Sequence, residues 1–573
     1  MLETIKEISS SFFGANGENR QAFPEPPIGA ETYAASATVN LLALALPLTV
    51  LQVYDRVLPN AAFETLALLI IILCCAVCID AALKYLRSKV VNWSAASFTH
   101  KLSVDAFTSM LSTKPSRFSQ TTSSEHLERY NSISGLGNHI SAHSRIVIVD
   151  ILFIPVFSAV ILLIGGWIFA SVVFLFAIFG YMALKSTRSI NDLIAEREQL
   201  DSRKQDFIIE ILGAIHTVKA NAMEPLIMRR FERLQSSASL LTRRMILLNG
   251  YSQTYQAAYA SLSTISIVAV GAVLAINGRL TLGALACCML LSSQLLQPLL
   301  RSLSSWNETK LAKHRQTRVE ALFETCPHQS KVSEPFFPKR FTPKSVRLKS
   351  VTIQRGEALP LFEDLSFDIK AGSFIAIKGV DGSGRSTLLR ALRYDAPITK
   401  GEIIFGDGSL AKNSEAAVRA SVRYVGQTPV IFRGSILDNI TLFGETPVHV
   451  ALSASKFVGL DEEIARMPLG YDTVLKSNVA SDLPAPTAQR ITLARALAMR
   501  PSVLILDEAN TLLDFAGEQQ FIRALEKLRG KTTIILSSHR PSMLRLADQV
   551  YEIKGLKLVA TSVPDHFRQA TAS

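Results

Sequence analysis

Long stretches without charged residues limit the fold of this chain more than any other feature of its sequence. The first covers residues 32–54, which contain no Asp, Glu, Lys or Arg. Because a helix rises about 1.5 Å per residue, these 23 residues are enough to cross the roughly 30 Å hydrocarbon layer of a membrane. Apolar residues make up 48% of the 573-residue chain and charged residues only 19%. With the apolar residues concentrated in such runs, the composition excludes an ordinary soluble enzyme and predicts a membrane protein.

Further apolar stretches raise the predicted number of membrane spans to six. One covers residues 66–83. Residues 146–184 contain a single charge, at one edge, and as one helix they would be about 58 Å long. That is too long for one span, so two are predicted, with a turn near Gly165 and Gly166. The last two spans are predicted immediately before Arg279 and over residues 280–300.

The positions of the basic residues indicate how the spans are oriented. The chain has 60 Lys and Arg against 48 Asp and Glu, a formal charge of +12, which fits either nucleic acid or an anionic membrane surface. Basic residues gather in segments 84–145 and 185–250, whereas the opposite connections carry only Arg56 and Arg279. The positive-inside tendency therefore places both segments and both termini in the cytoplasm. A lipid bilayer is the predicted partner, and nucleic acid is not.

The two basic segments are predicted to be helical extensions of the spans. Apolar residues recur in them at helical spacing, for example over residues 200–210 and 223–234. The alternative is that they are solvated charged linkers. The first thirty residues lack a basic start followed by an apolar run, so no cleavable secretion signal is predicted.

A change in polarity marks a second domain. Residues 327–343 contain four prolines, a composition typical of a linker, and short apolar strands then alternate with helical stretches. The predicted architecture is an α-helical six-span transmembrane domain fused to an α/β domain. The predicted divisions are a short cytoplasmic segment over 1–31, the transmembrane domain over 32–325, the linker over 326–344, and the α/β domain over 345–573.

A glycine-rich loop in the second domain has the pattern of a phosphate cradle. Strand residues 374–378 lead into Gly-Val-Asp-Gly-Ser-Gly-Arg-Ser-Thr, and a helical stretch follows at 388–393. Glycines let backbone N–H groups wrap around phosphates, and a hydroxyl at the end of such a loop is a ligand for Mg²⁺. A lone glycine loop can also be a structural turn, but this strand–loop–helix order favours a P-loop nucleotide site. The predicted nucleotide-binding residues here are Gly379, Gly382, Ser383, Gly384, Arg385, Ser386 and Thr387, with Ser386 also assigned to the metal.

Polar residues after later strands complete the predicted site. The apolar run 503–506 ends in Asp507, assigned to Mg²⁺, and Glu508, assigned to polarise a water. His539 follows another strand and is predicted to contact a γ-phosphate, while Gln427 is predicted to contact the metal and nucleotide. Each of these residues alone would more often be a surface side chain, but their order after the glycine loop favours catalysis.

Taken together, these residues and the six preceding spans resemble the ATP-binding cassette (ABC) exporters. By resemblance, residues 379–387 correspond to the Walker A motif, Gln427 to the Q-loop, residues 503–508 to Walker B, residues 510–514 to the D-loop, and His539 to the switch histidine. The resemblance implies a P-loop ATPase that uses ATP and Mg²⁺ and works as a dimer of half-transporters, either homodimeric or heterodimeric.

The first span resembles a narrower group. Leu-Pro-Leu-Thr-Val-Leu-Gln-Val-Tyr-Asp-Arg-Val-Leu-Pro-Asn, residues 46–60, looks like the corresponding region of type I secretion permease/ATPases. That resemblance implies protein export across the bacterial inner membrane, with a periplasmic adaptor and an outer-membrane channel as partners. It also implies coupling helices around residues 125–133 and 213–225. For Tyr54, Asp55 and Arg56, interfacial anchoring is an equally good interpretation.

The sequence also departs from the family pattern. The usual Walker A lysine is Arg385, a planar fork instead of a compact ammonium. The family's Leu-Ser-Gly-Gly-Gln signature is replaced by Leu483, Pro484, Ala485, Pro486 and Thr487. Proline has no N–H to donate, and the signature serine is missing, so donors that would face a γ-phosphate are lost. The aromatic residue expected to stack on adenine falls near Arg355, whose guanidinium offers a less typical stacking surface.

These departures leave two hypotheses of different classes. The first is an ATP-driven exporter, with protein as the favoured cargo and lipid or peptide as the alternative. The second is a catalytically weak subunit that binds nucleotide and supports a partner. In the family it resembles, each ATP lies in a composite site between the Walker A motif of one half-transporter and the signature of its partner. In a homodimer of this chain both composite sites would be flawed on both sides, so slow ATP hydrolysis by this chain alone is predicted.

Overall fold

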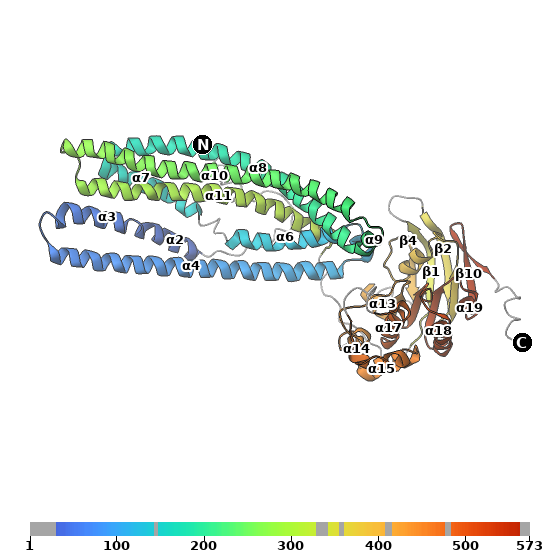
Figure 1. Ribbon diagram of the computed structural model, residues 1–573. Coiled ribbons are helices and arrows are strands. Elements are labelled where there is room, and N and C mark those ends of the chain that lie inside the picture. Colours follow the sequence, from blue (N-terminus) through green and yellow to red (C-terminus); the bar gives the residue numbers. More distant parts are fainter. Residues whose placement is uncertain are drawn as a thin grey trace, which may run out of the picture. The chain divides into compact units, whose positions relative to one another are not determined.

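A computed structural model describes residues 30–141, 147–327, 342–354, 360–406, 415–475 and 483–561. The chain forms two compact units (Figure 1), and each is described by itself. The first comprises residues 1–113 and 121–328, and the second comprises residues 114–120 and 329–573.

The first unit is entirely helical in its described part. Its helices are α2 (Ala30–Leu42), α3 (Ala45–Gln52), the π-helical turn η1 (Val53–Val57), α4 (Phe63–Ser112), α6 (Ser123–Ser141), α7 (Val147–Gly165), α8 (Ile168–Gly213), α9 (Ile215–Ala220), α10 (Glu224–Ile276) and α11 (Leu282–Thr325). Figure 1 shows α8, α10 and α11 side by side, and each pair of them is in contact. The short helix α5 (Pro115–Phe118) groups with the second unit.

The apolar helices occur where the sequence predicts spans. Among the described residues, three helices are long and apolar enough to cross a membrane: Ala30–Val57, Phe63–Ser112 and Glu224–Ile276. Three shorter apolar helices cover Val149–Gly165, Ile168–Met182 and Leu282–Leu295. The predicted turn near Gly165 is confirmed, because α7 ends there and Gly166 adopts a left-handed φ of 52° that favours glycine.

The basic segments are helical, as predicted, and the linker alternative is wrong. Residues 200–210 lie within α8, which is 46 residues long, and residues 223–234 fall almost wholly within α10, which is 53 residues long. Helices of this length extend well beyond the thickness of a hydrocarbon layer. Segment 125–133 lies inside α6, which packs on α4 and α11 around Leu102, Ala106 and Ile133. The coupling role of this segment stays a prediction.

Asp55 bonds the first apolar helices to the start of α11. Its Oδ1 accepts the Gly283 N–H at 3.0 Å, and its Oδ2 accepts the Thr281 hydroxyl at 2.7 Å. Thr281 in turn caps α11 by accepting the Ala284 N–H at 3.1 Å. A carboxylate at a helix N-terminus satisfies otherwise unpaired N–H groups, so Asp55 has a structural role in addition to any interfacial one.

The second unit contains a six-stranded sheet in the order β11–β10–β3–β9–β8–β5. All neighbouring strands in it are parallel except β10 and β11. Its strands are β3 (Phe374–Lys378), β5 (Val422–Val425), β8 (Val503–Asp507), β9 (Thr533–Ser537), β10 (Gln549–Lys554) and β11 (Lys557–Thr561). Both β8 and β9 are buried along their whole length, as their continuous apolar runs predict.

Helices and a smaller antiparallel sheet enclose this central sheet. The smaller sheet has the order β2 (Pro360–Ile369), β1 (Val346–Gln354), β4 (Ile398–Phe405), and a short pair is formed by β6 (Gly434–Ser435) and β7 (Val474–Leu475). The helices are α12 (Arg385–Ala391), α13 (Glu415–Ser421), α14 (Ile436–Thr441), α15 (Val448–Phe457), α16 (Asp461–Ile464), α17 (Ala485–Ala498), α18 (Phe515–Leu528) and α19 (Pro541–Leu544). Two apolar clusters result, one involving α14, α15 and α17 and the other involving β1, β2 and α12.

The sheet topology positions the predicted site residues. Parallel pairing aligns Asp507 at the end of β8 with Ser537 at the end of β9. The glycine loop follows β3, which lies next to β9. The loop, Glu508 and His539 therefore emerge at the carboxyl edge of one sheet, where open α/β sheets bind ligands.

Candidate nucleotide-binding site

The loop after β3 requires glycine at defined positions. Gly382 and Gly384 have φ values of 80° and 91°, in the left-handed region. A β-carbon at Gly384 would also lie 3.0 Å from the Phe362 ring, and one at Gly379 would lie 2.7 Å from the Ser383 hydroxyl. The left-handed backbone at Gly382 and Gly384 therefore favours glycine, as a loop that wraps its backbone around phosphates requires.

Arg385 connects the loop to the end of β8. Its side chain is only 8% exposed, and its Nη2 lies 2.9 Å from Asp381 Oδ1 and 2.8 Å from Glu508 Oε1. Its Nη1 is also buried and has no hydrogen-bond partner among the described residues. A buried guanidinium needs several acceptors, so Arg385 has one unused donor group beside the loop.

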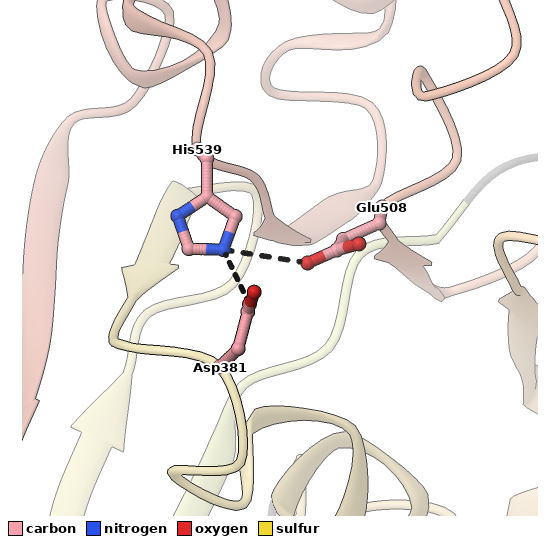
Figure 2. Close-up of side chains that lie close together, drawn as sticks. All are labelled: Asp381, Glu508 and His539. Carbon is pink, nitrogen blue, oxygen red and sulfur yellow. Dashed lines mark ion pairs between the residues drawn. The ribbon is translucent and has the colours of Figure 1, made fainter.

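His539 completes a cluster with the same two carboxylates. Its Nε2 lies 3.4 Å from Asp381 Oδ1 and 3.6 Å from Glu508 Oε1. Figure 2 shows the three side chains converging on one point, with His539 approaching both acidic groups. Their ligand atoms lie within 4.8 Å of one another, close enough to share a cation. The structure thus brings together Arg385, Glu508 and His539 from the sequence prediction and adds Asp381, which the sequence analysis missed.

Glu508 is held in an unusual backbone conformation. Its φ is 50°, which is costly for a residue with a side chain, and its N–H donates to the Ser537 carbonyl at 3.0 Å. Such strain persists only where surrounding contacts impose it. Here it turns the carboxylate from the end of β8 toward Arg385 and the glycine loop.

Asp507 has a partner that the sequence did not indicate. Its side chain is buried, and its Oδ2 accepts the Tyr424 hydroxyl from β5 at 2.6 Å. Burial raises the pKa of Tyr424, and the hydrogen bond to Asp507 raises it further. The phenol therefore remains a donor at physiological pH. Because it donates to Oδ2 of Asp507, Oδ1 is available to a metal.

The residues predicted to hold Mg²⁺ are suited to that ion. Ser386 lies in the first turn of α12 and is exposed, Asp507 ends β8, and exposed Gln427 follows β5 by two residues. A hydroxyl, a carboxylate and an amide are all oxygen ligands of the kind that Mg²⁺ prefers. The structure supports the donor set, while the assignment itself stays a prediction.

The segment in place of the signature begins α17 with few donors. Pro484 precedes the helix and Pro486 lies in its first turn, so Ala485 and Thr487 are the only backbone donors between residues 484 and 487. Thr487 is buried, and its hydroxyl donates to Glu463 Oε2 at 2.8 Å. The one hydroxyl of the segment therefore points into the domain instead of toward a ligand.

Two other predicted elements have different outcomes. In the D-loop segment, Asn510 Oδ1 accepts the Ser538 hydroxyl at 3.3 Å, and Asp514 caps α18 by accepting the Gly517 N–H at 2.9 Å. This links the loop after β8 with the residue preceding His539. Arg355 lies outside the described residues, so its stacking on adenine stays a prediction.

Comparison with known proteins defines the class. Residues 33–299 match the family model of the ABC transporter transmembrane region, and residues 362–511 match the ABC transporter model. A solved bacterial Atm1-family ABC exporter with ATP bound has the same fold, with a TM-score of 0.78 at 21% identity over 94% of this chain and 96% of that one. The chain therefore belongs to the ABC transporters, and its second domain is a P-loop ATPase domain coupled to transport.

Similar curated proteins belong to protein-translocation systems. The alpha-hemolysin translocation ATP-binding protein HlyB of Proteus vulgaris is 27% identical over 530 residues, which are 91% of this chain and 73% of that protein. The exotoxin translocation ATP-binding protein PaxB of Pasteurella aerogenes is 28% identical over 529 residues, with the same coverage. The cyclolysin secretion/processing ATP-binding protein CyaB of Bordetella pertussis is 26% identical over 92% of this chain and 74% of that protein.

Proposed function

We propose that this chain is a half-transporter of a type I secretion-like system that exports protein across the bacterial inner membrane. The proposal is supported by the similarity to toxin-translocating proteins along more than nine-tenths of the chain. Two half-transporters would pair, with their nucleotide-binding domains in the cytoplasm. A periplasmic adaptor and an outer-membrane channel would continue the export path.

The residues predicted for phosphate, metal and catalysis have these roles in the proposal. The loop 379–387 binds the phosphates of ATP, and Ser386, Asp507 and Gln427 hold Mg²⁺, which neutralises phosphate charge. Glu508 polarises the attacking water, and His539 contacts the γ-phosphate. The observation that carries the assignment is that Arg385 of the loop lies within 3 Å of Glu508, which in turn lies 3.6 Å from His539.

A second candidate function is a nucleotide-binding subunit with weak catalysis. It is favoured by two features, the ion pair between Arg385 and Glu508 and the prolines at 484 and 486. Paired with a standard half-transporter, one composite site would combine Arg385 with an intact signature. The other would combine an intact lysine with residues 483–487, so this chain would support turnover that its partner dominates.

One measurement tests the cargo, and a second separates the two candidate functions. Deleting the gene should remove at least one protein from the culture medium. If the secreted proteins are unchanged while the exported lipids or peptides differ, lipid or peptide is the favoured cargo. Affinity purification of the tagged chain from its natural host identifies the dimer. If the chain is recovered with a second ABC half-transporter, the weakly catalytic subunit is favoured. If the chain is recovered only as an active self-dimer, that second candidate function is wrong.

A further inference from the structure

We infer that the nucleotide site of this chain prefers a nucleoside diphosphate to a nucleoside triphosphate, because Asp381 and Glu508 share the positive charge that a third phosphate would need. The inference rests on the proposed nucleotide function and specifies which ligand state the site retains.

The third phosphate of a bound triphosphate would point toward the ends of β8 and β9. A P-loop cradles the α- and β-phosphates, and the γ-phosphate extends toward the residues that orient the attacking water. In this chain those residues are Glu508 and His539, which lie opposite the loop at the ends of β8 and β9. A third phosphate must therefore enter the space around which Asp381, Glu508 and His539 converge (Figure 2).

The positive charge of Arg385 is already shared between two carboxylates. Nη2 of Arg385 lies within 3 Å of both carboxylates, so one guanidinium already faces two negative groups. A third phosphate adds further negative charge at the same place, and like charges at short range repel strongly where solvent is partly excluded. Arg385 itself is 8% exposed and Glu508 is 23% exposed, so this pair is shielded from solvent.

Arg385 keeps one donor group for a phosphate. The buried Nη1 of Arg385 has no partner among the described residues and can donate to one phosphate group beside the loop. The fork of arginine permits this division, since one nitrogen serves the carboxylates while the other serves a ligand. A lysine would present a single compact ammonium to all of them.

Asp381 offers a way to test the inference without disturbing the fold. Its side chain is 93% exposed, and within the described structure it makes ionic contacts with Arg385 and His539. Replacing it by serine removes one negative charge from the predicted γ-phosphate position. It leaves Arg385, Glu508 and the loop glycines in place.

The experiment measures binding of ADP and of the non-hydrolysable triphosphate AMP-PNP to the purified full-length protein with Mg²⁺. Wild type is expected to bind ADP about tenfold more tightly, and Asp381→Ser is expected to reduce that preference by about threefold, because Glu508 remains and the charge of exposed Asp381 is partly screened. Asp472→Ser, at an exposed carboxylate elsewhere in the domain, should preserve the wild-type ratio. Thermal unfolding of both variants checks that they are folded.

The possible results distinguish this inference from the proposed function. If wild type binds both nucleotides equally, or if Asp381→Ser leaves the ratio unchanged, the diphosphate preference is wrong while nucleotide binding stands. If neither nucleotide binds wild type, both the preference and the proposed function are wrong.

Discussion

Arg385 Nη2 lies 2.8 Å from Glu508 Oε1, so the cation of the glycine loop is paired with the carboxylate proposed to polarise the attacking water. An ion pair of this length occupies both groups. Nucleotide must therefore compete for Arg385, and Glu508 must be released before it can orient a water. This relationship and the donor-poor start of α17 are the two structural reasons to expect slow hydrolysis.

Restoring hydrolysis should require correcting both halves of the composite site. Arg385→Lys alone, or replacement of residues 483–487 by Leu-Ser-Gly-Gly-Gln alone, is expected to change the ATPase rate of the purified protein by less than about threefold. The combined variant should gain at least about tenfold, because residues that act as a unit are not additive. Adding Glu508→Gln to it should abolish the gain. Simple additivity of the two changes would argue against a composite site.

Tyr424→Phe should destabilise the second unit by about 1–2 kcal/mol, because buried Asp507 loses a hydrogen-bond donor. The pKa of Tyr424 is raised above its ordinary value near 10, so the folded protein retains a proton that the unfolded chain loses above that pH. The stabilisation from Tyr424 is therefore full below pH 10 and decreases as the pH rises further. The gap between the unfolding midpoints of wild type and variant should therefore shrink steadily as the pH is raised above about 10, and a constant gap would contradict the assignment.

Glu463 should be important for the start of α17. Its two oxygens accept the Thr487 hydroxyl at 2.8 Å and Arg490 Nη1 at 2.7 Å, and Arg490 is only 8% exposed. Glu463→Gln should therefore cost about 1–3 kcal/mol of unfolding free energy, measured by thermal or denaturant unfolding. The exposed neighbour gives the control, since Glu462→Gln should stay within about 0.5 kcal/mol of wild type. Equal losses of unfolding free energy for Glu463→Gln and Glu462→Gln would show that Glu463 has no special role at the start of α17.

Two glycines of the helical unit should respond to alanine in opposite directions. A β-carbon at Gly283 would lie 2.5 Å from Asp55 Oδ1 and 2.8 Å from the Leu51 carbonyl oxygen, so Gly283→Ala should destabilise the protein by about 1–3 kcal/mol. Gly250 lies in α10 with open space around it, so Gly250→Ala should stabilise by up to about 1 kcal/mol. Thermal unfolding in detergent tests both. If Gly283→Ala is as stable as Gly250→Ala, the close contact between Gly283 and Asp55 is absent.

The sequence predicted those features that depend on local pattern. Uncharged runs located the apolar helices, because membrane-crossing length and composition are properties of a single segment. The strand and glycines before Arg385 likewise located the loop after β3, since its conformation depends on Gly382 and Gly384 themselves.

Contacts between distant segments could not be predicted in the same way. The partnership of Tyr424 with Asp507 depends on β5 lying next to β8, and that of Asp381 with His539 depends on β3 lying next to β9. Strand order is not visible in a single sequence. The only sequence signal for Asp381 is that it is an acidic residue within a glycine loop. Its role becomes visible only when the structure places Arg385 between Asp381 and Glu508.

The most direct test is the steady-state ATPase rate of the purified, full-length protein without any partner, compared with Glu508→Gln. A chain that binds nucleotide at a site defective on both sides should hydrolyse ATP slowly, at a rate close to that of the variant. Turnover of about 1 per second or more that Glu508→Gln abolishes would contradict this account.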